Sequence, residues 1–585
     1  MPVSPVDPLR QRLRRHLTVL YGRPTARWAV EALMELLEPS LQAHHPVRPR
    51  LFSERDVVLI TYADQIREPD RPPLHTLDDF LRERVDGVIS NVHLLPFFPY
   101  TSDDGFAVVD YTAVDPAAGT WEDVRRLSRH VGLMADAVVN HSSASAPWFC
   151  DWLDDAPDRA GFYRAEDPNL DVSRVTRPRT TPLLTPFDAA DGTRHVWTTF
   201  GPDQVDLDYR NPATLFAMTE VILRYIAEGA RFIRLDAVAF LWKDPATSSV
   251  HLPQTHEIVR LWRTVVDAVA PGTLLITETN VPHTENVGYF GNGDDEAHLV
   301  YQFPLAPLIL SAFHLADSST LQEWAATLRP PTPMTTFFNF LGSHDGIGLR
   351  PAEGMLTRAE IQHLCDLAVA HGGGVSYRTG PGGTMAPYEL NTVFFDALNP
   401  VGTTEPVTRQ VDRFLAAQSI LLSLAGVPGI YVHALLGSRN WIDGVQATGR
   451  LRTINRQKLD RATLEAELDD PDSLRHRIFH RFLERIAVRC RQPAFHPSGP
   501  QRILATAPTV FAFERWAPDG SSKILCVHNL SGRDQLVHLD RSTGLSLRQG
   551  RLEDLLGGRP VTVDPHGAAD VSVGAYGVRW LCGSQ

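Results

Sequence analysis

The spacing of apolar residues along the chain changes twice. Within residues 1–50, leucines and valines recur every three or four residues, which is the period of an amphipathic helix. From about residue 57, short β-rich runs such as "VVLITY" alternate with helical stretches. After residue 495 the helical period stops, and short strands with turn signals follow. The pattern predicts a helical extension, a large α/β domain and a small β domain.

Eight runs in the middle region have the composition of buried strands. Helical stretches such as 121–131, 212–230 and 256–270 separate them, as parallel strands require. Eight such units suit a closed (β/α)8 TIM barrel, and an open, doubly wound sheet is the alternative. The predicted strands span 57–62, 87–97, 132–141, 232–238, 273–279, 298–303, 335–345 and 426–432.

Polar residues at the strand ends favour the barrel. His93, His141, Asp236, Glu278 and Asp345 all lie towards the C-terminal ends of predicted strands. In a TIM barrel these ends form the face on which active sites are built. The barrel is therefore the preferred prediction.

Two gaps between predicted strands are too long for a single helix. Residues 142–211 (domain B) follow the third strand and residues 346–412 (a second lid domain) follow the seventh, and long inserts of this kind are typical of functional lids. The expected domains are an N-terminal helical extension at 1–50, a catalytic barrel at 51–494 that contains both inserts, and a small β-sandwich domain at 495–585.

Composition narrows the function classes. The 585 residues are 43% hydrophobic and 21% charged, which is globular composition. The formal net charge of -13 gives no global field for nucleic acid, so local arginines or lysines would have to bind any anion. No stretch has the length of a membrane span, and the first residues lack the apolar core of a signal peptide. We expect a soluble, cytoplasmic protein whose five scattered cysteines are reduced thiols.

Three carboxylates are expected to converge on one face of the barrel. Asp236, Glu278 and Asp345 each stand where an apolar strand gives way to a loop. A helix cap or a core salt bridge would explain any one of them alone. Together they suit glycosyl transfer, in which one carboxylate attacks the anomeric carbon and another protonates the leaving oxygen, with retention if the two lie about 5 Å apart.

Five segments in order, "DDGFAVVDY", "VVNH", "RLDAV", "TET" and "SHDGIG", resemble the signature segments of the α-amylase superfamily, glycoside hydrolase family 13. Within it, "LLPFFPYTSDDGF", "VWTTFGPDQVDLD" and "TINR" are similar to the sucrose-phosphorylase branch. "VTRPRTTPLLTPF", "ITETNVPH" and "PYELN" most resemble the bacterial glucosylglycerate phosphorylases. That similarity runs from about residue 50 to past residue 490 and includes the helical extension.

The resemblance implies a role for each carboxylate. It makes Asp236 the nucleophile, Glu278 the general acid/base and Asp345 the stabiliser of the transition state. Asp236 must then be ionised while Glu278 is protonated, so their environments must separate their pKa values. Arg234 shares a face with Asp236 by strand alternation and supplies the positive partner.

The same resemblance implies contacts to the glucosyl unit. A core position is the alternative for each histidine, and more so for each phenylalanine. The implied contacts are Asp103, Phe106, His141, Phe200, Gln204, Arg234, His344 and Arg456.

Anion binding is expected from named arginines. "TRPR" supplies Arg177 and Arg179, and the resemblance favours Arg179 as a phosphate ligand, with a solvated basic turn as the alternative. Arg350, Tyr388 and Glu389 are the hypothesised acceptor contacts. Sucrose phosphorylases commonly carry glutamine where Glu389 stands, so the chain departs from them at this position.

The expected reaction is 2-O-α-glucosylglycerate plus phosphate giving α-glucose 1-phosphate plus D-glycerate, by double displacement. The alternatives are sucrose, sucrose 6-phosphate or glucosylglycerol as substrate, a hydrolase or transglucosidase, and a non-catalytic binding barrel. Some α-amylases bind calcium near the residue matching Asn140, but phosphorylases of this branch usually do not, so no metal or other cofactor is expected. The expected partners are small substrates and neither nucleic acid nor membrane, with a homodimer left open.

Overall fold

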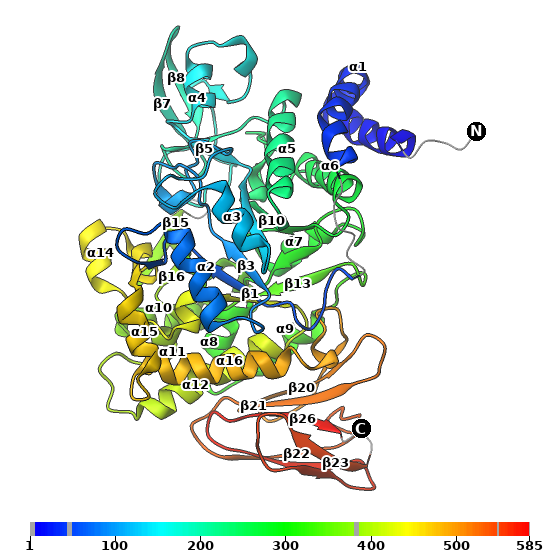
Figure 1. The fold of residues 1–585 in the computed structure, drawn as a ribbon, viewed down its shortest axis with the longest axis vertical. Helices are drawn as coiled ribbons and strands as arrows, with labels where there is room; N and C mark the ends of the chain where they lie inside the picture. The colour runs from blue at the N-terminus through cyan, green and yellow to red at the C-terminus, as the bar shows by residue number, and fades with distance from the viewer. Residues whose placement is uncertain (1–5, 44–49, 380–384, 547–548, 584–585) are drawn as a thin grey trace.

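Eight parallel strands close the predicted barrel. The computed structural model describes residues 6–43, 50–379, 385–546 and 549–583. β1 pairs with β3 on one side and with β17 on the other, which excludes the open sheet (Figure 1). The barrel strands are β1 (Val58–Thr61), β3 (Asn91–Leu94), β4 (Gly132–Val138), β10 (Ala230–Asp236), β11 (Leu274–Thr277), β12 (Leu299–Tyr301), β13 (Thr336–Asn339) and β17 (Val427–Tyr431).

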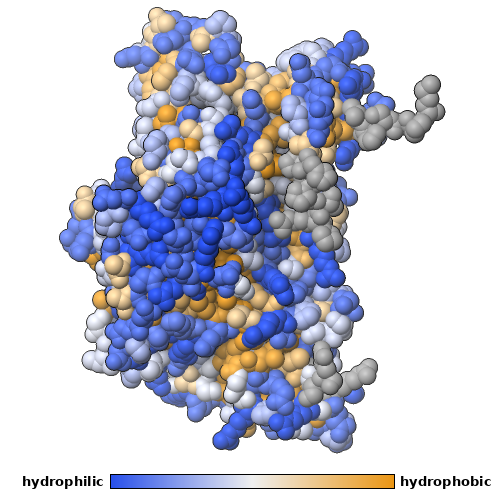
Figure 2. All heavy atoms as spheres, viewed as in Figure 1, coloured by the Kyte–Doolittle hydropathy of each residue, from blue (hydrophilic) through white to orange (hydrophobic). Residues whose placement is uncertain are grey.

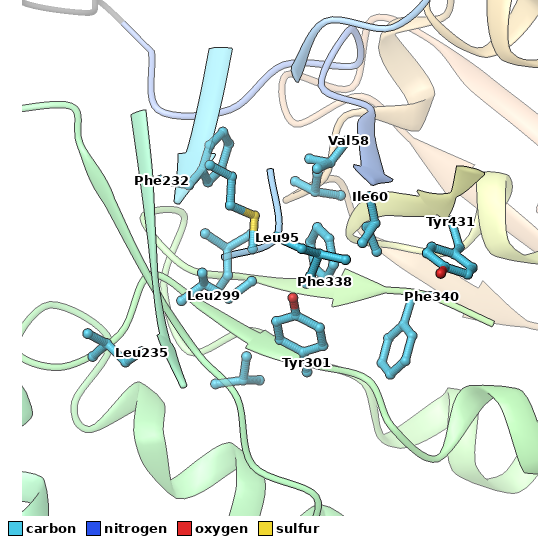
Figure 3. Close-up of a cluster of buried hydrophobic side chains, with 14 of the residues drawn as sticks. Val58, Ile60, Leu95, Phe232, Leu235, Leu299, Tyr301, Phe338, Phe340 and Tyr431 are labelled. Atoms are coloured by element: carbon cyan, nitrogen blue, oxygen red, sulfur yellow. The ribbon is translucent and has the colours of Figure 1, made fainter. Parts of the chain in front are cut away.

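The barrel strands are buried on both faces, which explains their nearly continuous apolar runs. Figure 3 shows Ile60, Tyr301 and Phe338, from three different strands, in one buried cluster. Every barrel strand ends before its predicted last residue, and two of these corrections bear on the carboxylates. β10 stops at Asp236 because Ala237 has φ 52°, a left-handed conformation that turns the chain out of the sheet. β13 stops at Asn339, so Asp345 lies in a loop.

Helices cover the outside of the barrel (Figure 1). The three helices named from the sequence are confirmed, although α6 begins at Pro253, where a proline at the first helical position needs no N–H partner. The longer helices in and around the barrel are α2 (Pro73–Arg84), α3 (Trp121–Ser128), α5 (Pro212–Ala227), α6 (Pro253–Val269), α8 (Leu305–Leu315), α9 (Ser319–Thr327), α12 (Val407–Ser423), α15 (Arg461–Asp469) and α16 (Leu474–Arg489).

The N-terminal segment is helical, as predicted. α1 (Val6–Gln42) breaks at Gly22, where φ is 77°, and its buried leucines pack on α5 and α6. His16 hydrogen-bonds Glu257 (2.8 Å) and Thr264 (3.1 Å), both of α6. The extension is therefore fastened to the outer helices of the barrel.

Two groups of short elements follow β4 and β13. The first group stands above the barrel and the second lies beside it (Figure 1). α12 begins at Val407, inside the range expected for the second insert. The first group holds β5 (His141–Ser143), α4 (Pro147–Leu153), β6 (Ala165–Glu166), β7 (Leu184–Ala189), β8 (Gly192–Trp197) and β9 (Gln204–Asp206). The second holds β14 (Ile347–Gly348), α10 (Arg358–Ala370), β15 (Gly374–Thr379), β16 (Met385–Asn391) and α11 (Phe394–Leu398).

The C-terminal region is built from antiparallel strands, as predicted. Six strands form one sheet in the order β19-β20-β21-β26-β23-β24, and β22 pairs with β25. Val527, Val537 and Val571 belong to one apolar cluster that joins the two sheets into a sandwich. The strands are β19 (Gln501–Ile503), β20 (Val510–Trp516), β21 (Lys523–Asn529), β22 (Gln535–Leu539), β23 (Gly550–Asp554), β24 (Val561–Val563), β25 (Ala569–Val573) and β26 (Val578–Gly583).

Hydrophilic residues cover most of the face seen in Figure 1, and hydrophobic residues gather in its lower half (Figure 2). Among the helices within the described residues, none is both long and apolar enough to cross a membrane.

One buried arginine ties several elements together near the start of β1. The fully buried guanidinium of Arg489, in α16, donates to the carbonyl oxygens of Leu422 (2.9 Å), Phe495 (3.2 Å) and Asp56 (3.4 Å). Backbone oxygens from four separate segments of the chain thus depend on one side chain, since Arg489 also donates to the carbonyl of Gly426.

We expect Arg489→Met to destabilise the protein by about 2–4 kcal/mol, because it strips buried carbonyl oxygens of their donor. Thermal unfolding should show a lower Tm. Arg491→Met, which changes an exposed arginine two residues further on, is the matched control and should leave Tm nearly unchanged. Equal Tm values for the two variants would contradict this role for Arg489.

Candidate active site

Three carboxylates meet in one cavity at the C-terminal end of the barrel. Asp236 is the last residue of β10, Glu278 directly follows β11, and Asp345 lies between β13 and β14; all three line the cavity. The left-handed turn at Ala237 directs its backbone N–H at Glu278 Oε2, 3.1 Å away. The same turn therefore ends the strand at Asp236 and holds the second carboxyl in place.

Arg234 lies beneath the cavity and contacts both carboxyls unequally. Its Nη1 donates to Asp236 Oδ1 at 2.7 Å and also to Asp136, while its Nη2 lies 3.9 Å from Glu278 Oε2. Asp136 stands opposite Arg234 in the pairing of β4 with β10, and it accepts a 2.7 Å bond from His93. Although burial raises the pKa of Asp136, Arg234 and His93 lower it to about 2.

Asp236 and Glu278 are two buried carboxyls beside one guanidinium. Burial raises the pKa of both, that of Asp236 well above its ordinary value, although the charge of Arg234 lowers both. Two buried carboxyls on one guanidinium favour a single shared proton. Because the direct charge-assisted hydrogen bond goes to Asp236, we assign the negative charge to Asp236 and the proton to Glu278.

Asp345, unlike Glu278, is held in the ionised state. Although burial raises the pKa of its carboxyl, neighbouring His344, Arg452 and Arg456 lower it well below its ordinary value. Burial lowers the pKa of His344 itself to about 3, so His344 is neutral near pH 7. The two arginines, at 2.8 Å and 3.8 Å, are therefore the cations that keep Asp345 ionised.

Arg452 is the principal cavity residue that the sequence reasoning missed. Its Nη1 contacts Asp345 at 2.8 Å, and its Nη2 donates to both oxygens of Glu389, at 2.8 and 2.9 Å. It lies one helical turn before Arg456 in "RLRTINR", and that spacing was the available signal. Other cavity residues not named from the sequence are Ala237, Asn280, Phe303 and Gly346.

The residues expected to contact a glucosyl unit line the cavity, with the exceptions of Arg234 and Arg456. Gln204 Nε2 lies 3.2 Å from His141 Nε2 and 3.4 Å from Asp103 Oδ2. Phe106 stacks on His344 with ring centroids 4.7 Å apart. The residues in the wall are Asp103, Phe106, His141, Phe200, Gln204 and His344.

Arg234 hydrogen-bonds Asp236 without lining the cavity, and Arg456 also does not line it. The guanidinium of Arg456 pairs with Asp104 and donates to the carbonyl of His344 at 2.8 Å. It also lies 3.8 Å from Asp103 Oδ1. Arg456 therefore positions residues that the cavity exposes.

Only some of the residues expected to contact phosphate or the acceptor line the cavity. Arg179, Tyr388 and Glu389 line the cavity, and Arg179 lies over the Tyr388 ring, 5.9 Å from its centroid. Arg177 and Arg350 are not among the cavity-lining residues, and Arg350 lies 4.0 Å from Glu285. The structure thus does not bring these two arginines to the cavity wall, and their roles stay predictions.

The position where some amylases bind calcium holds an ammonium group. Asn140 Oδ1 accepts a 2.8 Å bond from Lys243 Nζ, which lies 3.2 Å from Asp206. Elsewhere in the described part of the chain, no group of three or more His, Cys, Asp or Glu residues could hold a metal ion. The arrangement offers acid/base and nucleophilic chemistry from carboxylates.

The chain is similar to known enzymes that act on sugars. The family described as "Alpha amylase, catalytic domain" matches residues 87–351. A glucosylglycerate phosphorylase of Allomeiothermus silvanus is 49% identical over 529 residues, which cover 90% of this chain and 94% of that protein. One from Spirochaeta thermophila is 44% identical over 99% of both chains.

Among solved structures, the sucrose 6F-phosphate phosphorylase from Thermoanaerobacter thermosaccharolyticum is similar in fold. Its TM-score is 0.71 at 23% identity, with 89% of this chain and 98% of the other covered.

Replacing Arg452 with methionine tests how Asp345 is kept ionised. Loss of one of its two cations should raise the pKa of Asp345. As the proposed stabiliser of the transition state, Asp345 must be ionised, so a pKa raised into the working range should move the acid limb of the pH profile of kcat to higher pH. An unmoved acid limb would refute this assignment.

The double variant Arg452→Met/Glu389→Gln separates charge from stability. In the single variant, Glu389 is left buried without its partner, which destabilises the fold. Neutralising Glu389 as well should raise Tm above that of Arg452→Met while the acid limb stays shifted.

Proposed function

The chain belongs to the α-amylase family, glycoside hydrolase family 13, and on that premise we propose that it is a retaining glucosylglycerate phosphorylase. It converts 2-O-α-glucosylglycerate and phosphate into α-glucose 1-phosphate and D-glycerate, reversibly. The observation that carries the proposal is the unequal contact of Arg234 with Asp236 and Glu278, which provides an ionised nucleophile beside a protonated acid. The identity to two glucosylglycerate phosphorylases supports the choice of substrate.

The first displacement forms a glucosyl ester. Asp236 Oδ attacks the anomeric carbon as the bond to the glycerate oxygen breaks. Glu278 gives its proton to that oxygen, so glycerate leaves as the alcohol. Asp236 loses its negative charge in the ester while Glu278 gains one by giving up its proton, so the pair keeps a single negative charge, which Arg234 lies close enough to offset.

The second displacement regenerates the enzyme. A phosphate oxygen attacks the anomeric carbon from the side that glycerate left, and the bond to Asp236 breaks. Glu278 takes the phosphate proton and returns to its starting state. Two inversions at one carbon give net retention, and the product is α-glucose 1-phosphate.

The surrounding cavity supplies a negative charge near the reacting carbon and hydrogen-bonding groups for the glucosyl hydroxyls. Asp345, held ionised by Arg452 and Arg456, stabilises the oxocarbenium-like charge that develops in each step. The residues proposed to hold the glucosyl hydroxyls are Asp103, His141, Gln204 and His344, with Arg456 acting through Asp104 and His344. Neutral histidines can donate or accept such bonds, and burial lowers the pKa of His141 to about 4.

Phosphate and glycerate both carry negative charge, so their sites need cations. Arg179 is the proposed phosphate ligand, because it lines the cavity. Its guanidinium lies over the ring of Tyr388 and forms no ion pair with a described carboxylate. Glu389 is neutralised by Arg452, which lets an anionic acceptor lie nearby. We also propose that the reaction needs no metal or other cofactor.

We propose the domain division expected from the sequence, with the two inserts after β4 and β13 acting as walls of the site. Arg179 and Gln204 come from the first insert and Tyr388 and Glu389 from the second, which supports that role.

A cytoplasmic location is also proposed, because the five cysteines are free and Cys150 is exposed.

Offering α-glucose 1-phosphate with a panel of acceptors tests the substrate. D-Glycerate should release phosphate much faster than glycerol, fructose or fructose 6-phosphate, and Asp236→Asn should lower the rate by more than about a thousandfold. Faster release with fructose would favour a sucrose phosphorylase. Glucose release as the main reaction without phosphate would make the protein a hydrolase.

A further inference from the structure

A second chamber adjoins the active-site cavity. The two spaces share Asp103, Arg179, Phe200, Gln204 and Arg452 in their walls, so they lie side by side. The outer wall of the chamber comes from the "TRPRTT" loop, from β15 and from the segment that follows α14 (Ile442–Thr448). The outer residues of this chamber are Thr180, Thr181, Ser376, Tyr377 and Arg450.

The chamber carries positive charge that no carboxylate neutralises at close range. Four arginines and two aspartates line it, in the described residues. Arg456 pairs with Asp104, and Arg452 pairs with Asp345 and Glu389 of the inner cavity. The other two, Arg179 and Arg450, make no ion pair within 4.0 Å to any described carboxylate.

Arg450 is held at the chamber by the local backbone. Gly449 ends α14 in a left-handed conformation with φ 67°, which suits glycine, and the chain then passes through Arg450 into the 3-10 turn Leu451–Asn455. Arg450 is exposed. Burial raises the pKa of Asp104, and the charges of Arg456, Lys458 and Arg450 lower it.

The wall of the chamber also contains a hydroxyl group, that of Thr181, which makes no hydrogen bond among the described residues. Its Oγ1 is buried. A buried hydroxyl without a partner is unfavourable, and an oxyanion in the chamber would accept its proton. The chamber thus combines two cations with a free donor, which is the chemistry of an oxyanion site.

We propose that this outer chamber is a capture site for the anionic co-substrates, phosphate and a small carboxylate, before they enter the catalytic cavity, and that Arg450 is its principal cation. The inference rests on the proposed function, because a phosphorylase with an anionic acceptor must bring two different anions to the catalytic cavity. Arg450 then acts on the concentration and entry of the anion and not on the chemical steps.

Kinetics of Arg450→Ala test the capture site. The KM for inorganic phosphate should rise about twofold to fivefold, the effect of losing one exposed charge, with kcat unchanged. Hydrolysis of α-glucosyl fluoride without phosphate, which uses no anionic co-substrate, should keep its kcat/KM. Added sodium chloride should raise the phosphate KM of the wild type more steeply than that of the variant.

Two further variants make the outcome decisive. Arg450→Lys keeps the charge and should restore the phosphate KM, while Arg450→Glu should raise it further than alanine does. Arg409→Ala, at an exposed arginine of α12 that does not line the chamber, is the matched control and should leave KM as in the wild type.

The possible failures are distinguishable. A wild-type protein without phosphorolysis would overturn the proposed function itself. Normal phosphorolysis with the same phosphate KM in Arg450→Ala and Arg409→Ala would overturn only the capture site. An equal loss on α-glucosyl fluoride would show that Arg450 has a structural role instead.

Discussion

Arg234 is 2% exposed, and a guanidinium so deeply buried must be surrounded by anions to remain stable. Asp136 and Asp236 accept its hydrogen bonds, and Glu278 lies within reach of its second amino group. The barrel fixes this arrangement through the register of β4 with β10, because Arg234 and Asp136 face each other across the pair. The proposed nucleophile is therefore also a structural partner of the buried guanidinium.

A second charged network links the barrel to the second insert. Arg452 joins Asp345, which follows β13, to Glu389 of β16, and Arg456 joins Asp104 to the backbone at His344. Each of these arginines has a carboxylate within hydrogen-bond distance, as buried charges require. The insert proposed to contribute acceptor contacts is thus coupled to the carboxylate proposed to stabilise the transition state. Arg179 and Arg450, which make no ion pair with a described carboxylate, line the outer chamber proposed to capture anions.

The sequence predicts the barrel because the period of each strand and the polar residue at its end are local properties. Asp236 and Glu278 stand out for that reason, and the structure brings both to one guanidinium. Asp136 and Arg452 were missed because their importance depends on pairing partners far away in the chain. Arg177 differs from Arg179 by two residues, and only the course of the loop decides which one reaches the cavity. The end of β10 depends on the left-handed backbone of Ala237, for which an alanine gives no signal.

The measurement that most directly tests the account is the mass of the protein after reaction with α-glucosyl fluoride in a Glu278→Gln background. Loss of the acid/base slows release of the glucosyl group more than its capture, because fluoride leaves without protonation. The account predicts an increase in mass by one glucosyl unit, located on the peptide that contains Asp236. A glucosyl group on another residue, or no covalent adduct while turnover continues, would contradict it.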